Sequence, residues 1–274
     1  MQKIIVPVDF SSTAANAAEF AGNLAVFYNA EIWLYHTYEL PVAIGEFTYP
    51  LFDIPEMQKA AEHEIGILKE ELLGKLRSKV NVHIKTEMAV LKDGLAEFCD
   101  YLQPDLVVMG LSGSDALTKL VVGSNTIKII HELKYPVLVI PPKATFAPVL
   151  KIGFACDYKQ IEQSTPVTLM KKIVTDFNAA LYILNVDFND RNFTDEVLQT
   201  SFGIKELFKD VNPVYESIES ENVTKGINEF AAKAGLNWIA VIPKKHTLLQ
   251  KIFSRSHSTD LLYHTSVPIL CIHQ

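Results

Sequence analysis

The residues best suited to chemistry form one glycine-containing stretch in the first half of the chain. Gly110 and Gly113 are followed, after nine further residues, by Gly123 and Ser124. The stretch begins where the apolar run 106–109 ends, and a segment of helical period follows it. Such a loop lies where open α/β sheets bind ligands, and its glycines allow a close backbone approach. The spacing therefore predicts either a phosphate-binding loop or a turn that only reverses the chain.

The residues after the last glycine favour a phosphate site. The N–H groups of Ser124, Asn125 and Thr126 would open a helix, where the helix dipole favours an anion. The Ser124 hydroxyl either adds a donor for phosphate or caps the helix, and the two roles can coexist. Lys119 either screens phosphate charge or is a solvated loop residue.

Other catalytic and nucleotide-binding patterns do not occur in the sequence. The first apolar run lacks the glycine pattern of dinucleotide-binding folds, and no P-loop pattern is found. His36 and His131 lie within a predicted strand and a predicted helix, where structural roles are commoner than catalytic ones. No metal-binding spacing of His, Cys or carboxylate residues is present. We therefore predict no catalytic residue and no metal ligand.

Short apolar runs rich in Ile and Val alternate with segments of helical period. Strands this apolar, separated by helices, indicate a parallel sheet with helices on both faces. Ser11 and Ser12 are candidate helix N-caps, and Asp93 is expected to cap a later helix. The expected strands are 4–8, 31–37, 82–89, 106–109 and 137–140, and the expected helices are 13–28, 54–80, 93–102 and 124–133.

The same order of elements recurs in the second half of the chain. Asp157 stands where the first copy has Asp9, and the expected strands are 151–157, 181–186, 238–242 and 267–271. The proline-containing stretch 141–148 has no periodicity and is the expected linker, with a boundary near residue 145. We therefore predict an α/β protein of two tandem doubly wound domains, residues 1–143 and 149–274. Each should have a five-stranded, mainly parallel sheet with helices on both faces.

Charge and composition limit the partners. Lys and Arg number 25 against 32 Asp and Glu, and the net charge of -7 argues against a general duplex-binding surface. The longest apolar stretches are far shorter than the roughly 20 residues that cross a bilayer, and the start does not resemble a signal peptide. We expect a cytoplasmic protein with no nucleic-acid or membrane partner. Cys99, Cys156 and Cys271 lie in apolar segments and are predicted to be buried thiols.

Several segments, in the same order along the chain, resemble the universal stress protein family. The stretch from Gly110 to Ser124 matches the family's nucleotide loop, G-2x-G-9x-G-[S/T], at every fixed position. The opening 4–11 is similar to the family's first strand, and 135–140 resembles its last strand. The likeness covers the whole chain as a tandem of two such domains.

In ATP-binding members of that family, adenine lies between the ends of the first two strands and the phosphates lie on the glycine loop. The resemblance therefore implies ATP as the ligand, with Mg2+ beside the triphosphate. Asp9 would accept a hydrogen bond from the ribose or the adenine amine, or alternatively cap the following helix. The implied adenosine contacts are Pro7, Val8 and Asp9, Thr37 near the base, and Met109 and Gly110 beneath the ribose. The implied phosphate contacts are Gly113, Gly123, Ser124, Asn125 and Thr126.

The second copy departs from the family pattern. Pro243, His246 and Arg255 stand at its three glycine positions, and only Ser256 keeps its type. Side chains there obstruct a close backbone approach, and proline lacks an N–H, so we expect one nucleotide site per chain. The basic stretch 244–257 either is a solvated loop or contacts an acidic partner or phosphates from the other half.

The resemblance also implies how the two halves pair. Single-domain members of the family pair through their last strands, so strands 137–140 and 267–271 would cover one another's edges. The tandem chain would then be an internal pseudo-dimer, and a homodimer of the whole chain stays open.

Three classes of function stay open at this point. The leading one is an ATP-binding stress-response or regulatory protein with a degenerate C-terminal copy. The second is a slow ATPase or a self-phosphorylating protein with Ser112, Ser114 or Ser124 as acceptor, although no general base is evident. The third is a nucleotide-free scaffold that acts through an unknown protein partner.

Overall fold

The chain divides into two compact units, the first taking the described residues up to Phe146 and the second those from Ala147. This computed structural model describes residues 1–40, 53–111, 126, 129, 130, 132–155, 165–187, 203–220, 222–242 and 267–272. The units are considered separately below.

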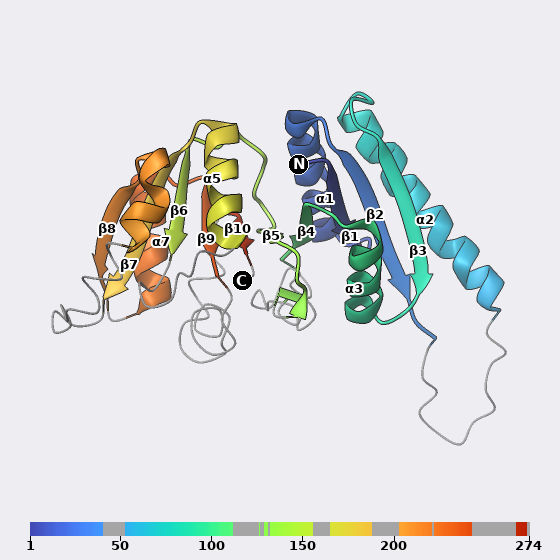
Figure 1. The fold of residues 1–274 in the computed structure, drawn as a ribbon. Helices are drawn as coiled ribbons and strands as arrows, with labels where there is room; N and C mark the ends of the chain where they lie inside the picture. Colours follow the sequence, from blue (N-terminus) through green and yellow to red (C-terminus); the bar gives the residue numbers. More distant parts are fainter. Residues whose placement is uncertain are drawn as a thin grey trace, which may run out of the picture. The chain divides into compact units, whose positions relative to one another are not determined.

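The first unit is built on a parallel sheet (Figure 1). Its strands lie in the order β3-β2-β1-β4-β5, and every neighbouring pair runs parallel. Their bounds are β1 (Lys3–Pro7), β2 (Glu31–Tyr38), β3 (Val82–Met88), β4 (Leu106–Gly110) and β5 (Val137–Ile140). Helices α1 (Ser12–Tyr28), α2 (Ile54–Lys75) and α3 (Leu91–Leu102) connect the strands. The chain therefore runs outward from β1 to β3 and then crosses back to place β4 on the other side of β1.

Helices cover both faces of this sheet. Phe98 of α3 contacts Trp33 and Tyr35 of β2, with ring centroids 5.7 and 5.2 Å apart. Successive strand residues point to opposite faces, so the fully buried Ile32 and Leu34 face the other way. Figure 1 shows α1 and α2 on that opposite side of the sheet.

The second unit repeats this plan. Its parallel strands lie in the order β10-β9-β6-β7-β8. Phe230 contacts Tyr182 on one face of the sheet. Phe208 contacts Phe154, which is paired with Ile183 and therefore lies on the other face, because Tyr182 and Ile183 are successive residues of β7. The elements are β6 (Lys151–Ala155), α5 (Thr165–Phe177), β7 (Ala180–Asp187), the 3-10 turn η1 (Lys209–Val211), β8 (Val214–Glu219), α7 (Val223–Ala234), β9 (Trp238–Val241) and β10 (Ile269–Cys271). The predicted α/β fold class is therefore confirmed, and β8 is a strand that the sequence did not reveal.

Two local predictions were wrong. Helix α2 stops at Lys75 and not near residue 80, because Arg77 and Ser78 both have left-handed backbone, with φ of 52° and 55°. Asp93 does not cap α3: the helix begins at Leu91 after Val90, which makes no side-chain capping bond. Asp93 instead lies in the first turn, where its charge favours the helix dipole.

The cysteines and the surface charges of the described residues can be compared with the expectations from composition. Cys99 and Cys271 are buried free thiols, as predicted, whereas Cys156 lies outside the described residues. Burial, and secondarily the nearby Asp100 charge, raises the pKa of Cys99 to about 12.

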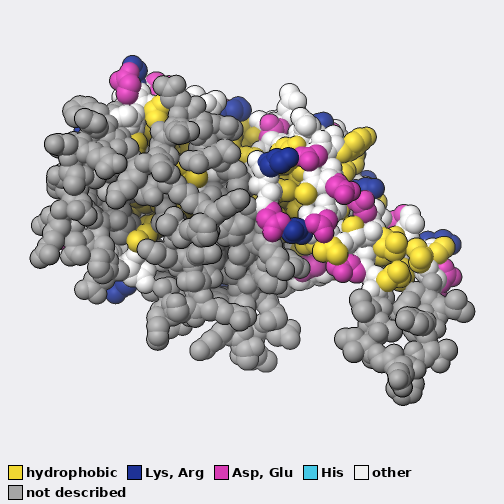
Figure 2. All heavy atoms as spheres, turned by 60° about the horizontal axis from the view of Figure 1, so that its bottom comes forward, with side chains coloured by type: hydrophobic (Ala, Val, Ile, Leu, Met, Phe, Trp, Pro, Cys, Tyr) yellow, Lys and Arg dark blue, Asp and Glu magenta, His cyan; other side chains and the backbone are white. Residues whose placement is uncertain are grey.

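On the part of the first unit visible in Figure 2, acidic and basic side chains are interspersed with hydrophobic ones. No helix within the described ranges is long and apolar enough to cross a membrane.

Candidate functional site

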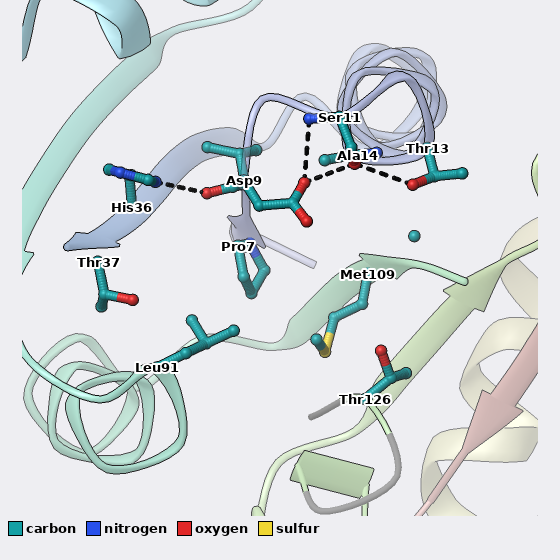
Figure 3. A pocket seen from close by; sticks show the side chains of 12 residues that line it. Pro7, Asp9, Ser11, Thr13, Ala14, His36, Thr37, Leu91, Met109 and Thr126 are labelled. Carbon is teal, nitrogen blue, oxygen red and sulfur yellow. Dashed lines mark hydrogen bonds between the residues drawn. The ribbon is translucent and has the colours of Figure 1, made fainter. Parts of the chain in front are cut away.

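A pocket lies at the carboxyl ends of β1, β2 and β4 in the first unit (Figure 3). The connection after β1 leads to one side of that strand, and the connection after β3 leads to the other, so β1 and β4 flank the point where the strand order reverses. Open α/β sheets bind ligands at this point. The lining residues are Pro7, Val8, Asp9, Ser11, Thr13, Ala14, His36, Thr37, Leu91, Met109, Gly110 and Thr126.

The structure brings together all the residues that the family resemblance implies as adenosine contacts. Pro7, Val8, Asp9, Thr37, Met109 and Gly110 line this one pocket, and Thr126 of the predicted phosphate group joins them. The remaining predicted phosphate contacts, Gly113, Gly123, Ser124 and Asn125, lie outside the described residues. These seven residues thus share one pocket, while the adenine nucleotide that they would bind stays a prediction.

Asp9 supports the helix cap without being the cap. The Ser11 hydroxyl caps α1 by accepting a hydrogen bond from the Ala14 N–H at 3.2 Å, which confirms Ser11 as an N-cap. Asp9 Oδ1 accepts from the Ser11 N–H at 3.1 Å and from the Ser11 hydroxyl at 2.5 Å. One oxygen of Asp9 is thus used to hold the turn, and Oδ2 makes no hydrogen bond to any residue that the structure describes.

Gly110 is needed for the approach of two chain segments. A Cβ atom on Gly110 would lie 2.6 Å from the Thr13 carbonyl oxygen and 2.8 Å from the Thr13 carbonyl carbon. From the sequence, this glycine was expected either to approach a ligand or to serve a turn of the chain. The structure adds that the end of β4 and the first turn of α1, both of which line the pocket, are in backbone contact.

Comparison with known proteins decides the family. Residues 1–141 match the Universal stress protein family. The chain belongs to this family. It is 31% identical over 144 residues to Universal stress protein MJ0531 of Methanocaldococcus jannaschii, a match that covers 51% of this chain and 81% of that protein.

Solved structures of universal stress proteins share the fold over the whole chain. A universal stress protein from Archaeoglobus fulgidus DSM 4304 has a TM-score of 0.73 at 15% identity, covering 99% of this chain and 98% of that one. A putative universal stress protein from Pseudomonas aeruginosa UCBPP-PA14 has a TM-score of 0.60 at 14% identity, covering 100% and 93%. At such identities the likeness shows the fold alone.

Sequence reasoning missed His36 as a residue that lines the pocket of this universal stress protein. Its Nδ1 lies 2.8 Å from the Val8 carbonyl oxygen, which can only accept, so Nδ1 carries the proton. The Phe10 ring lies 4.3 Å from the imidazole, and Phe10 has a left-handed backbone with φ of 61°. His36 therefore has the partners of a structural histidine and also lines the pocket, so its structural role stays a prediction. Its position beside Thr37 at a strand end was the available signal for the pocket.

A second missed feature is the packing behind Thr37. The buried Tyr35 hydroxyl donates to Glu87 of β3 at 3.1 Å, and a Cβ atom on Gly94 of α3 would lie 2.4 Å from that hydroxyl. Burial, together with the Glu87 charge, raises the pKa of Tyr35 above its ordinary value. This contact joins β2, β3 and α3 close to where Thr37 and Leu91 line the pocket.

Proposed function

We propose that this universal stress protein binds an adenine nucleotide, with ATP as the leading candidate, in the pocket of its first unit. The observation that carries the proposal is the place of the pocket. It lies at the switch point between β1 and β4, and it unites the residues that the family pattern assigns to adenosine. Binding would then act as a regulatory signal that a protein partner recognises.

The lining residues fit such a ligand. Pro7, Val8, Leu91 and Met109 supply apolar surface of the kind that packs on a base, and half of the twelve lining residues add a polar side chain that can orient a ligand. Asp9 offers an acceptor for the adenosine part of the ligand. At the opposite rim, Thr126 is only 2% exposed and places a hydroxyl beside Met109 (Figure 3).

A binding role fits these residues better than turnover. Among the described residues that line the pocket, Asp9 and His36 are the only ionisable ones. No group of His, Cys, Asp and Glu within the described ranges is arranged to hold a metal ion. We propose that Mg2+ would accompany the nucleotide and be held mainly by its phosphates. A slow ATPase or self-phosphorylating activity is an alternative that the experiments below address.

Calorimetric titration of the full chain with ATP and Mg2+ tests the proposal. We expect one ATP per chain, since only the first copy has the glycine loop. Gly113→Val should abolish binding, because a branched side chain would stand where phosphate should approach. The matched control is His246→Val, which puts the same side chain at the corresponding position of the second copy and should leave binding unchanged. Absence of binding to the wild-type chain, or equal binding by Gly113→Val, would refute the proposal.

A further inference from the structure

Strand β3 is the outer strand of the first unit's sheet (Figure 1). It pairs with β2 over its whole length, Val82–Met88, and no strand in the described part of the chain pairs with its other side. Sheet edges carry unpaired N–H and C=O groups, and proteins commonly protect them with a proline, a bulge or a very short strand. β3 has seven residues, no proline and an uninterrupted register with β2. Its outer edge is therefore suited to the addition of another strand.

The backbone groups on this outer edge belong to the even-numbered residues of β3. The Ile32 N–H of β2 donates to the Asn81 carbonyl at 2.9 Å. Because successive residues of a strand direct their N–H and C=O groups to opposite sides, the odd-numbered residues bond to β2. Ile84, Thr86 and Met88 therefore direct both backbone groups away from β2, toward the side on which no described strand lies.

The side chains along this edge are apolar on one face of the sheet. Ile84 and Met88 lie on the same face as Leu34, with which Ile84 is paired. They are 37% and 47% exposed, and Val90, just beyond the strand, is 52% exposed. Exposed apolar side chains beside an unpaired edge favour a partner that covers them.

The opposite face carries one charge of each sign. Lys85 and Glu87 flank Thr86 and point to the same face, because they are two residues apart in a strand. Glu87 Oε2 accepts the hydrogen bond of the Tyr35 hydroxyl. Lys85 forms no ion pair with any residue that the structure describes. The edge therefore offers a positive and a negative group that are not paired with each other within one chain.

We propose that two copies of this chain pair antiparallel through the edges of β3, about a two-fold axis at Thr86. In this register Lys85 of each copy lies opposite Glu87 of the other, and Ile84 lies opposite Met88. Ile84, Thr86 and Met88 of the two copies then exchange backbone hydrogen bonds, because each directs both groups outward. Opposite charges and a Thr–Thr pair are favourable across strands. The surface is thus complementary to itself, as a two-fold interface requires.

The charges select this register over its neighbours. Moving the axis by one residue, to Lys85 or to Glu87, sets two identical charges directly opposite one another, which is destabilising. Moving the axis to Ile84 leaves neither charge opposite its counterpart. Of these positions, only Thr86 pairs both charges of both copies.

The outer strand of the second unit, β8, lacks this complementarity. The strand registers place Ser217 in β8 where β3 has Thr86. Ser217 is flanked by Glu216 and Ile218, so a two-fold pairing there would set a Glu opposite an Ile and form no ion pair. A second copy of β3 is therefore the partner that fits the edge of β3, and β8 provides a control.

Sedimentation velocity of the full chain without nucleotide tests the proposal at roughly 1 to 300 μM, where a small interface associates reversibly. We expect a monomer–dimer equilibrium. Thr86→Pro removes an N–H from the outer edge and none from the bonds to β2, so an edge strand can tolerate it. It should weaken the dimer roughly tenfold or more, because the hydrogen bonds on the axis are lost. The matched control, Ser217→Pro, makes the same change in β8 and should leave the dimer unchanged.

Charge reversal tests the register. Lys85→Glu sets like charges opposite each other and should weaken the dimer roughly tenfold or more at low salt, with a smaller effect at high salt. Mixing this variant with Glu87→Lys should restore a dimer, since every interface pair would again join opposite charges. Circular dichroism checks that Glu87→Lys, which loses its contact with Tyr35, is folded. If it is not, Lys85→Glu and Thr86→Pro decide the question.

Three outcomes would overturn the inference. A wild-type chain that stays monomeric at all concentrations has no such interface. A dimer that Thr86→Pro leaves intact is formed by another surface. Growth into open filaments would indicate pairing of β3 with a different strand such as β8, because a head-to-tail contact need not close. None of these outcomes bears on the proposed nucleotide site, since the measurement is made without nucleotide.

Discussion

Gly110 and Thr13 are in backbone contact although they lie in different elements of the first unit. The position of a Gly110 Cβ atom is 2.6 Å from the Thr13 carbonyl oxygen, closer than real Cβ atoms come to a neighbour. Gly110 ends β4, and Thr13 lies in the first turn of α1. Two walls of the pocket therefore hold their spacing only while position 110 has no side chain.

Replacing Gly110 with alanine should destabilise the protein. The methyl group would press on backbone atoms that cannot rotate away, so α1 and β4 must move apart. Overpacking of this kind costs about 1 to 3 kcal/mol in the free energy of unfolding. Urea unfolding followed by circular dichroism measures the change, and ATP affinity should fall with it because both walls line the pocket.

The matched control for this prediction is Gly66→Ala. Gly66 lies within α2, and a Cβ atom there would meet nothing within 4 Å. The same substitution should therefore stabilise the protein by about 0.5 to 1 kcal/mol through helix propensity. If both variants shifted the unfolding midpoint in the same direction, the contact between Gly110 and Thr13 would not be the cause.

Asn16 should stabilise the segment that follows β5. Its side-chain amide donates to the Pro141 carbonyl at 3.2 Å and to the Ala144 carbonyl at 3.1 Å. Asn16→Ala would leave two partly buried acceptors without this donor, at a cost of about 1 to 3 kcal/mol. Asn23→Ala is the control in the same helix. Among the residues that the structure describes, the Asn23 side chain bonds only to the nearby Glu19 carbonyl, so its loss should cost less. Equal costs in urea unfolding would contradict the prediction.

The positions of the apolar strands could be predicted from the sequence, because each is a short run with a clear end, whereas β8 (Val214–Glu219), with two Glu residues among six, was missed. Residues 137–140 were predicted and observed as β5 without a change in either bound. The end of α2 could not be predicted in this way, since nothing in the composition of Arg77 and Ser78 announces left-handed backbone.

For the site too, one part could be predicted and another could not. The family resemblance assigned Asp9 and Thr37 to one site, and both lie at the carboxyl ends of neighbouring parallel strands, β1 and β2. The bonds that orient the site join residues through side-chain geometry that periodicity does not encode. The Tyr35 hydroxyl of β2 donates to Glu87 of the neighbouring strand β3. Thr13 is linked to Asp9 through hydrogen bonds to Ser11.

The alkaline limit of stability should depend on Tyr35. The folded-state pKa of this buried hydroxyl is raised above the ordinary value of 10.0, so the unfolded chain releases the proton first. The free energy of unfolding should thus be constant below about pH 9 with respect to this group and fall as the pH rises above 10, with a slope of up to about 1.4 kcal/mol per pH unit. Urea midpoints measured from pH 8 to 11 would follow the loss.

Tyr35→Phe isolates this contribution. The variant should be less stable near pH 8, by about 1 kcal/mol for the lost hydrogen bond to Glu87. Its loss of stability above pH 10 should be shallower than that of the wild type, because the variant has no Tyr35 proton to release. Some loss should remain, since the pKa of Cys99 is also raised. Parallel curves for the two proteins would show that Tyr35 does not set the alkaline limit.

ATP should be recovered intact after binding, because hydrolysis needs more than the pocket is known to offer. A water must be held in line with the γ-phosphate, and arginine-type or metal clamps that stabilise the charge are each worth about 10³ or more in rate. The described lining has no Lys or Arg, and the sequence from 110 to 126 adds only Lys119 and Asp115 as charged residues.

The nucleotide should therefore act by shifting the conformational population. Amide exchange should slow at Ser11, Thr13, Met109 and Gly110 when ATP binds, and chromatography should find the ATP unchanged. Steady phosphate release by the wild type that disappears in Gly113→Val would instead establish the ATPase alternative, and incorporation of labelled phosphate into the chain would establish self-phosphorylation.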